Sequence, residues 1–462
     1  MFARRPMTLR GVTRDVWAGV LTACVFYAEY VSLGAALGDA LPGRTGAALG
    51  ALMVLGAVVL GCAIAVLLPR PLLAGPRGAS LAVLIAGMKF ASAQATVPEV
   101  RMESAVAGLM VILLTAAAMQ LLGLLKPVQN WIADSNVAMR KGFMFASGIG
   151  IVVGLGTTQL QSCLHVDPVA TAAVATAGVI AALTWGAACK YPGLRHTPLV
   201  RLAPLAIPIG VATATIGYYL FIADHAAGGY CGTLGSNGLR LSLLSEIAFG
   251  PHTVLTAWHY LPLWVWPVLL LIGSLLGGVM LLETLTTLRD SKDRSDRSHW
   301  PSHIGGNAFG NAVGALLGFS CVSLSTSRTN ALVESQANSR IAVLVHGACV
   351  LVIGLCLTSV IARLPQLAIA VALMVVAIQI IDDDTRKEVW SRGYRPDATA
   401  QTIHTTWIFL GVVGSSALIG MGLMKLGWGF GGGPLLALVL AAVLLRKGRT
   451  MGDQGHVVSS GR

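Results

Sequence analysis

Long apolar stretches alternate with short polar ones along the 462 residues of the chain. Several apolar runs exceed the ~18 residues that indicate a transmembrane helix. The pattern predicts an all-α polytopic membrane protein of about fourteen transmembrane helices, near 15–38, 46–68, 76–90, 103–125, 138–158, 167–188, 200–223, 264–288, 304–319, 327–337, 340–362, 366–381, 402–422 and 431–446.

These helices predict one transmembrane domain, 15–446, between an N-tail, 1–14, and a C-tail, 447–462. The first apolar stretch is too long for the hydrophobic region of a signal peptide, so we interpret it as a retained helix. The two longest polar interruptions, 224–263 and 290–303, are expected to be loops.

Two of the predicted helices, near 76–90 and 327–337, are too short to cross a membrane. Each follows backbone that cannot be regular helix: Gly75-Pro76 in one case and a hydroxyl-rich run ending at Ser327 in the other. Pro76 lies 61 residues after the first helix begins, and Ser327 lies 63 residues after the eighth begins. This correspondence predicts two inverted repeats, 15–223 and 264–446, whose discontinuous helices three and ten meet at a site in mid-membrane.

Composition and charge agree with a membrane protein and orient it. The chain is 55% hydrophobic and only 11% charged. Its net charge of +12 is divided unevenly, because connections on the side of the N-terminus carry 24 Lys and Arg and those on the opposite side carry six. This bias predicts an integral protein of a bacterial inner (plasma) membrane with both termini in the cytoplasm. The charge is therefore an orientation signal in the lipid bilayer and does not indicate a nucleic-acid partner.

Several motifs together resemble the SulP sulfate-permease and anion-transporter family. The most specific is GNAFGNAVGALLGFSCVSLSTSRTNALV, in which Ser-Arg-Thr opens the tenth helix after a GN-x-x-G helix. LLAGPRGAS resembles the family's third-helix start, DVWAG its opening motif, and RKGFMFASGIGIV its fifth helix. Leu282-Glu283 is similar to its eighth-helix glutamate, and the region from Leu364-Pro365 to Ile381-Asp382 to its twelfth helix.

The resemblance implies fourteen helices in a seven-plus-seven inverted repeat with two subdomains. Helices 1–4 and 8–11 form the substrate-carrying core, and helices 5–7 and 12–14 form the gate. It also implies elevator-type alternating access. The sequence departs from the family in lacking a C-terminal STAS domain and in carrying Arg77 where the family seldom has a cation. The oligomeric state, including a homodimer, is left open.

The residues at the two helix starts predict an anion site. Each helix N-terminus contributes about +0.5 of an elementary charge and free N–H groups. An arginine at membrane depth costs about 2.5–3.5 kcal/mol or more, which is hard to justify by packing alone. Substrate-binding candidates are Ser325, Ser327, Arg328, Thr329, Gly75, Pro76, Arg77 and Gly78. The alternatives are a structural ion pair of Arg328 with Glu334 or another acid, and a solvated or lipid-facing Arg77 just inside its helix.

Two acids are candidates for a coupling ion. Glu29 lies in the middle of the first helix and Glu283 late in the eighth. Charged groups at such depth are usually functional. We expect one or both to bind a transported proton, or Glu283 with Thr284 and Thr287 to hold Na⁺. The alternative for Glu283 is an interfacial pair with Arg289.

The predicted function is secondary active transport of a small anion of the sulfate, bicarbonate or dicarboxylate class, coupled to H⁺ or Na⁺. An anion channel or exchanger on the same fold and a nucleobase-type permease are the alternatives. No motif indicates an enzyme, an ATP-driven pump or a cofactor, and the eight cysteines lack metal-site spacing. His346 and His404 are expected to be core or interface residues. Whether Cys163 and Cys231 pair is left open.

Overall fold

The computed structural model describes residues 9–133, 160–189, 202–223, 231–233, 251–290, 297–335 and 337–380, with short gaps at 39, 43–45, 70–71, 161–162, 203–204, 338, 357–359 and 362. All of them belong to one of the two compact units into which the chain divides. The helices predicted at 138–158, 402–422 and 431–446 lie outside the described residues.

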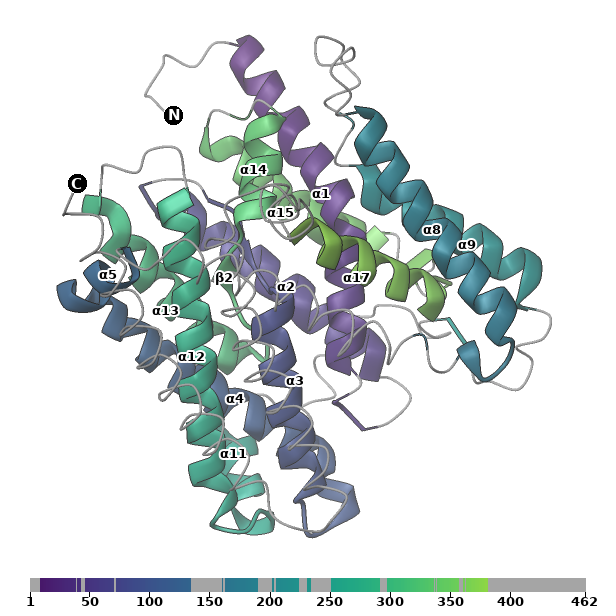
Figure 1. Cartoon of the computed structure of the whole chain (residues 1–462). Coiled ribbons are helices and arrows are strands. Elements are labelled where there is room, and N and C mark those ends of the chain that lie inside the picture. The colour runs from purple at the N-terminus through teal and green to yellow at the C-terminus, as the bar shows by residue number, and fades with distance from the viewer. Residues whose placement is uncertain are drawn as a thin grey trace, which may run out of the picture. The chain divides into compact units, whose positions relative to one another are not determined.

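The described part is built almost entirely from helices (Figure 1). Two short strands, β1 (Ala74–Gly75) and β2 (Ser323–Leu324), interrupt them. The principal helices are α1 (Leu9–Gly38), α2 (Gly46–Leu67), α3 (Gly78–Ala93), α4 (Arg101–Gln120), α8 (Pro168–Cys189), α9 (Ala206–Phe221), α12 (Val265–Asp290), α13 (Trp300–Leu317), α14 (Thr326–Glu334), α15 (Arg340–Cys356) and α17 (Gln366–Ile380).

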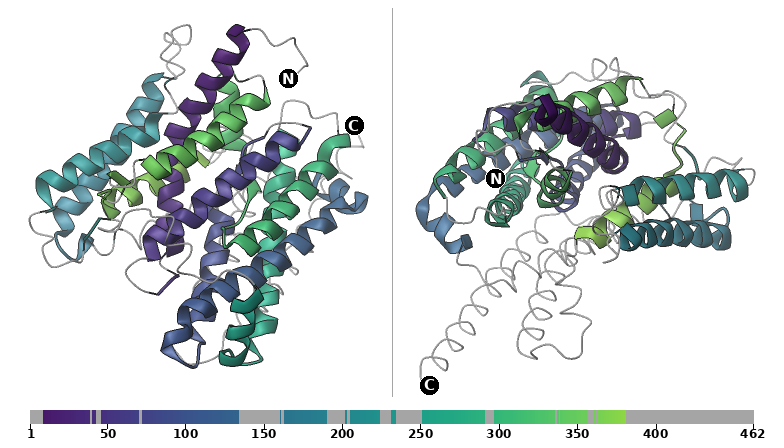
Figure 2. Two further views of the ribbon diagram at one scale, coloured as in Figure 1. Left: turned by 180° about the vertical axis from the view of Figure 1, so that it is seen from behind. Right: turned by 90° about the horizontal axis from the view of Figure 1, so that it is seen from above.

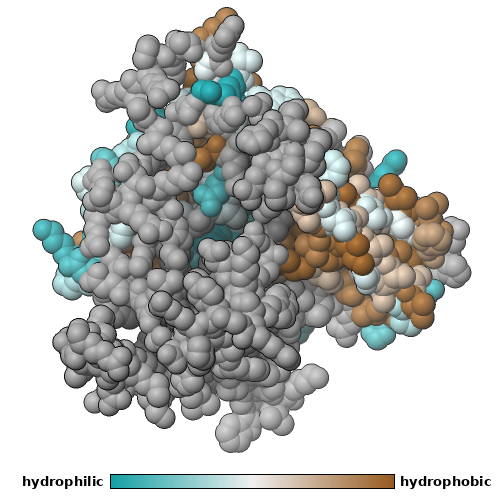
Figure 3. Space-filling model, turned by 45° about the horizontal axis from the view of Figure 1, so that its top comes forward, coloured by the Kyte–Doolittle hydropathy of each residue, from teal (hydrophilic) through white to brown (hydrophobic). Residues whose placement is uncertain are grey.

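Five helical segments among the described residues are long and apolar enough to cross a membrane: Gly11–Gly38, Gly46–Leu67, Pro98–Leu124, Pro168–Cys189 and Val265–Leu285. Large apolar side chains also cover the outside of α8 and α9, where Figure 3 shows hydrophobic surface gathered on the side of this helix pair. Val169, Ile216 and Leu220 are 78%, 61% and 67% exposed there. Such a surface is stable against lipid tails and unfavourable against water.

Helices distant in sequence pack together in two groups. In the first, α1 packs on α2 and α15, and α4 packs on α3, α12 and α13. In the second, α8 and α9 pack on each other, and α17 packs on both of them (Figure 2). Since α17 and α9 also contact α1, the groups join along the first helix.

The structure moves the start of the first predicted helix and adds two short helices. Helix α1 begins at Leu9, inside the predicted N-tail. The expected loop 224–263 contains helix α11 (Pro251–Tyr260). A short helix, α5 (Lys126–Ala133), follows α4 and a turn of 3-10 helix at Leu121–Leu124. Helix α11 has only ten residues, and its short mixed stretch of Trp, His and Tyr gives no long apolar run to detect.

A disulfide bond joins Cys163 to Cys231, a pairing that the sequence left open. The Tyr218 hydroxyl donates a hydrogen bond to the Cys231 carbonyl oxygen at 2.7 Å. The amide N–H of Gln366, the first residue of α17, donates to the Gly232 carbonyl oxygen at 3.0 Å. The segment 231–233 therefore ties together the starts of α8 and α17 and the side of α9.

Candidate anion site

The two non-helical segments that precede α3 and α14 lie side by side. Strands β1 and β2 pair in antiparallel fashion, with Ala74 opposite Leu324 and Gly75 opposite Ser323. The Ser325 N–H donates to the Leu73 carbonyl oxygen at 3.0 Å and extends this pairing by one residue. Non-helical backbone at membrane depth needs hydrogen-bond partners within the protein. Each break supplies them to the other, so the starts of the two short helices are held together.

An asparagine holds β2 from the other side. Asn311 of α13 donates from Nδ2 to the Val322 carbonyl oxygen at 2.8 Å, and its Oδ1 accepts from the Val322 N–H at 2.7 Å. Its side-chain amide thus makes the same pair of hydrogen bonds with Val322 that a neighbouring strand would make. Gly318 makes this return possible, because it ends α13 in the left-handed region with φ of 70°, which favours glycine.

The hydroxyl groups at the start of α14 mainly satisfy backbone groups. Ser325 caps the helix, its Oγ accepting from the Arg328 N–H at 3.4 Å. Thr329 Oγ1 accepts from the Leu73 N–H at 3.1 Å. Ser327 is exposed and its Oγ lies 3.2 Å from that of Ser325. Of the predicted hydroxyl donors, Ser327 is thus the one that faces outward.

Arg328 is fully buried and ion-paired. Its Nη2 donates to Glu29 Oε1 and to the Pro76 carbonyl oxygen, both at 2.6 Å. The acid in this pair comes from the middle of α1 and not from Glu334, which sequence reasoning had weighed as a partner. Among the described residues, no hydrogen-bond acceptor contacts Nε or Nη1. Nη1 lies over Gly75, where an added Cβ would be only 2.8 Å from it.

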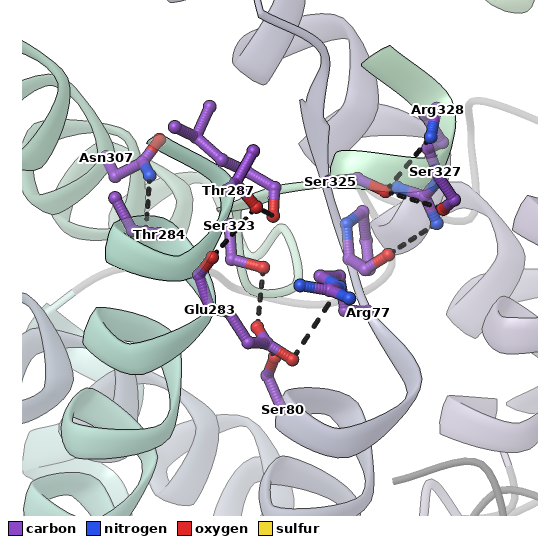
Figure 4. A network of polar contacts seen from close by, with 12 residues as sticks. Arg77, Ser80, Glu283, Thr284, Thr287, Asn307, Ser323, Ser325, Ser327 and Arg328 are labelled. Atoms are coloured by element: carbon purple, nitrogen blue, oxygen red, sulfur yellow. Dashed lines mark hydrogen bonds and ion pairs between the residues drawn. The ribbon is translucent and has the colours of Figure 1, made fainter. Parts of the chain in front are cut away.

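Glu283 forms the centre of a second cluster (Figure 4). Its Oε2 accepts from the hydroxyls of Ser80 at 2.6 Å and Ser323 at 2.7 Å. Its Oε1 lies 3.8 Å from Nε of Arg77. Thr287 Oγ1 lies 2.8 Å from the Glu283 carbonyl oxygen and 3.3 Å from that of Leu324, so this hydroxyl faces backbone.

Arg77 differs from its expected position. It lies before α3 in extended conformation, with φ of −120° and ψ of 151°, and the helix begins at Gly78. Pro76 keeps Gly75, the residue before it, out of helical geometry, and the non-helical backbone continues through Arg77. Arg77 is buried, at 8% exposure, and faces Glu283 (Figure 4). A solvated or lipid-facing position is therefore wrong for this residue.

The two ion pairs join early and late parts of the chain. Arg328, from the start of α14, pairs with Glu29 of α1, and Arg77, from the start of α3, pairs with Glu283 of α12. Each pair joins a segment before residue 100 to one after residue 260. Their formal charges sum to zero, so the fixed positive potential at the junction comes from the two helix N-termini.

Sequence reasoning found the two arginines and two acids but missed the polar groups around them. Ser80 and Ser323 are buried members of the Glu283 cluster, and Asn311 holds β2. Tyr30 lies beside Arg328, and His346 contacts the Tyr30 hydroxyl. Ser80 falls three residues after Arg77 on the first turn of α3, which was a usable signal. Nothing in the local pattern distinguishes Tyr30 or His346 from ordinary core residues.

A comparison with protein families finds a match over the segment that contains part of this site. Residues 302–402, which include β2 and α14, match the sequence model of the Sulfate permease family. No protein of curated function matches the chain by sequence.

Solved structures share the fold. The transmembrane domain of a cyanobacterial bicarbonate transporter, BicA, superposes with a TM-score of 0.56 at 20% identity, covering 87% of this chain and 97% of that one. SLC26A9 superposes with a TM-score of 0.56 at 15% identity, covering 87% and 62%. The murine Slc26a9 anion transporter in its inward-facing state gives 0.54 at 14% identity, covering 95% and 69%. The chain spans 62% of the SLC26A9 structure and nearly all of the BicA domain.

At these identities the structural matches establish the fold, that of a helical transmembrane domain. The sequence match falls on the segment that carries Ser325, Arg328 and Thr329. The apolar helices and the family match together identify an integral membrane protein of a transporter type and not an enzyme. The predicted resemblance to the sulfate permease family is thereby confirmed.

Proposed function

We propose that this protein is a secondary active transporter that carries a small oxyanion together with a proton. The substrate belongs to the sulfate, bicarbonate or dicarboxylate class. The observation that carries the proposal is Arg328: a fully buried guanidinium at the junction of two helix N-termini, with Nε and Nη1 unmatched among the described residues. An unsatisfied buried donor costs about 1–3 kcal/mol, and more when charged, which an anion would offset.

The geometry of the guanidinium supports coupling to a proton. A guanidinium can present two parallel N–H groups along either of two edges, Nε with Nη2 or Nη1 with Nη2. Both edges include Nη2, whose two N–H groups are held by Glu29 and Pro76. An oxyanion can therefore bind to two parallel N–H groups only when Glu29 or the Pro76 carbonyl oxygen releases Nη2, and of these two groups only Glu29 can lose its charge. A proton on Glu29 removes the competing negative charge and so favours anion binding.

The charge balance leads to the same conclusion. With Glu29 ionised, the junction has only the roughly +1 of the two helix ends. Protonation of Glu29 leaves Arg328 without a counter-charge and raises the total to about +2, since the second ion pair stays neutral. Anion and proton therefore stabilise each other at this site, which is the thermodynamic basis of symport.

Na⁺ coupling at Glu283 and Thr287 is the less favoured alternative. Both carboxylate oxygens of Glu283 already face hydrogen-bond donors or Arg77. Arg77 supplies the positive charge that Na⁺ would bring, and a second cation close to it would be repelled.

Transport by an elevator motion is consistent with this arrangement. The antiparallel pairing of β1 and β2 suits two inverted repeats, 15–223 and 264–446, that meet at the substrate. We propose that α1–α4 and α12–α15 form the moving core, and that α8, α9 and α17 belong to the gate. The membrane-spanning domain is then 15–446.

The deciding experiment is uptake of labelled sulfate, bicarbonate, nitrate, chloride and a dicarboxylate into proteoliposomes under imposed pH and Na⁺ gradients. We expect saturable uptake of at least one oxyanion that an inward proton gradient accelerates and a Na⁺ gradient does not. Acceleration by Na⁺ alone would favour the Glu283 alternative. A voltage-driven anion current far larger than the proton-coupled flux would make the protein a channel.

We also propose that both termini are cytoplasmic. The disulfide between Cys163 and Cys231 supports this orientation, because both cysteines fall on the predicted outer side and disulfides persist in oxidising compartments such as the periplasm. Cysteines introduced at 291–296 should react with an impermeant thiol reagent only from the cytoplasmic side, and those at 234–250 only from outside. The chain without introduced cysteines is the control. Reaction of both loops from one side would contradict the orientation.

A further inference from the structure

A buried aromatic ring lies against the guanidinium of Arg328. The Arg328 Cζ atom lies 4.6 Å from the centre of the Tyr30 ring, a distance at which a cation is attracted to an aromatic face. Tyr30 directly follows Glu29 on α1. One short segment of α1 thus supplies both the carboxylate bonded to Nη2 and the ring over which Cζ lies.

The Tyr30 hydroxyl is fixed by a second helix. It lies 3.0 Å from Nε2 of His346, a fully buried residue of α15. His346 Nδ1 lies 3.0 Å from Thr22 Oγ1, and the two rings of Tyr30 and His346 stand edge to face at 90°. A chain of contacts therefore runs from Thr22 through His346 and Tyr30 to Arg328.

The backbone carbonyl oxygens around Thr22 favour one direction for these hydrogen bonds. The Thr22 hydroxyl has a single proton, and with that proton on the Ala18 carbonyl oxygen at 2.8 Å, or on that of Gly19 at 3.1 Å, Thr22 Oγ1 accepts from His346. His346 must then carry its proton on Nδ1, and its Nε2 accepts the proton of the Tyr30 hydroxyl. A phenol that donates becomes richer in electrons, which strengthens the attraction of its ring for a cation.

We infer that Tyr30, anchored by His346, is a positioning residue that makes the site prefer oxyanions over halides. This inference rests on the proposed function. A guanidinium that lies over a ring and is also bonded to the Pro76 carbonyl oxygen has a restricted orientation, so its planar set of N–H groups can match two oxygens of an oxyanion. A guanidinium that is free to turn acts more like a point charge and attracts chloride as well as nitrate. The ring therefore controls the ratio of affinities more than their absolute level.

The test uses anions of equal charge, namely nitrate, bicarbonate and chloride, whose dissociation constants are measured on purified full-length protein in detergent or nanodiscs. Tyr30→Leu should weaken binding of nitrate and bicarbonate by about threefold to thirtyfold, the range of a buried cation–π contact, and that of chloride by less than about twofold. Tyr30→Phe keeps the ring and loses the anchor, so its effect should be smaller.

Variants of His346 provide a second, independent test of the role of Tyr30. His346→Leu removes the acceptor for the Tyr30 hydroxyl and should lower the oxyanion-to-chloride ratio, whereas His346→Gln retains an acceptor and should restore part of it. The matched control is Tyr27, which lies one turn earlier on α1 and is buried without a hydrogen-bond partner for its hydroxyl among the described residues. Tyr27→Leu should leave the ratio unchanged.

The outcomes separate the inference from the proposed function. An equal loss for oxyanions and chloride in Tyr30→Leu, or a wild-type protein with no preference for oxyanions, would overturn the positioning role. Unchanged affinity in Arg328→Ala would overturn the anion site itself. Anion binding that is lost with Arg328 while Tyr30→Leu keeps the wild-type ratio would leave the proposed function intact and refute only the role of Tyr30.

Discussion

Arg328→Ala is expected to weaken binding of the transported anion by about tenfold to hundredfold, measured as the dissociation constant of the purified protein. A hydrogen bond to a charged partner contributes about 1.5–3 kcal/mol, and tenfold corresponds to about 1.4 kcal/mol. Arg328→Lys should recover only part of the loss, because an ammonium keeps the charge without the planar fork. Ser327→Ala should have a smaller effect, since Ser327 is exposed and offers one neutral donor.

Arg328→Ala also breaks the ion pair with Glu29, so its effect on stability must be separated from its effect on anion binding. Removing Arg328 leaves Glu29 buried and unpaired, which destabilises a protein by about 3–5 kcal/mol. The double variant Glu29→Gln/Arg328→Ala removes both charges and should recover much of the thermal stability without recovering anion binding. Binding restored in the double variant, or wild-type affinity in a folded Arg328→Ala, would show that the arginine is structural.

Glu29→Gln is expected to uncouple anion movement from protons. A glutamine cannot take up the proton, and it also carries no negative charge to compete with the anion for Arg328 Nη2, so anion affinity should be equal to or stronger than that of the wild type. With the membrane potential held at zero, one proton per anion of one charge gives at most about tenfold accumulation per pH unit. Accumulation in Glu29→Gln vesicles should fall to about onefold while anion exchange continues.

Glu283→Gln is the matched control, because it changes the other buried acid by the same substitution. Its carboxylate pairs with Arg77 and two serines, whereas the carboxylate of Glu29 pairs with Arg328. We expect proton-driven accumulation to persist in this variant even where its stability falls. Accumulation that survives in Glu29→Gln and disappears in Glu283→Gln would assign the coupling to Glu283.

The local sequence was enough to predict the two short helices of the site and the non-helical segments before them. Gly75-Pro76 and the run of Ser and Thr before Arg328 break two apolar stretches, and helices break where glycine, proline and hydroxyl side chains compete with helical hydrogen bonds. Most of the described helices lie within a few residues of their predicted ranges, because a long apolar run has few other ways to satisfy its backbone in a bilayer.

Pairing across the chain could not be deduced in the same way. Arg328 and Glu29 are 299 residues apart, and the sequence offered Glu334 as a much nearer acid. His346 and Thr22 are separated by 324 residues, and neither helix carries a local pattern that predicts their contact. The third helix was predicted to begin at residue 76 and begins at Gly78, so Arg77, expected just inside the helix, has an extended backbone.

The crossed ion pairs also have a consequence for the order in which the protein is made. Glu29 leaves the ribosome 299 residues before Arg328, and Arg77 well before Glu283. At translation rates of about 5–20 residues per second, Glu29 waits roughly 15–60 s for its partner. During this interval the first helices hold an acid and a base inside or beside the bilayer without their final counter-charges. The early half of the nascent chain therefore lacks both ion pairs until the late half arrives, and the pairing of buried charges is complete only after α14 has been synthesised.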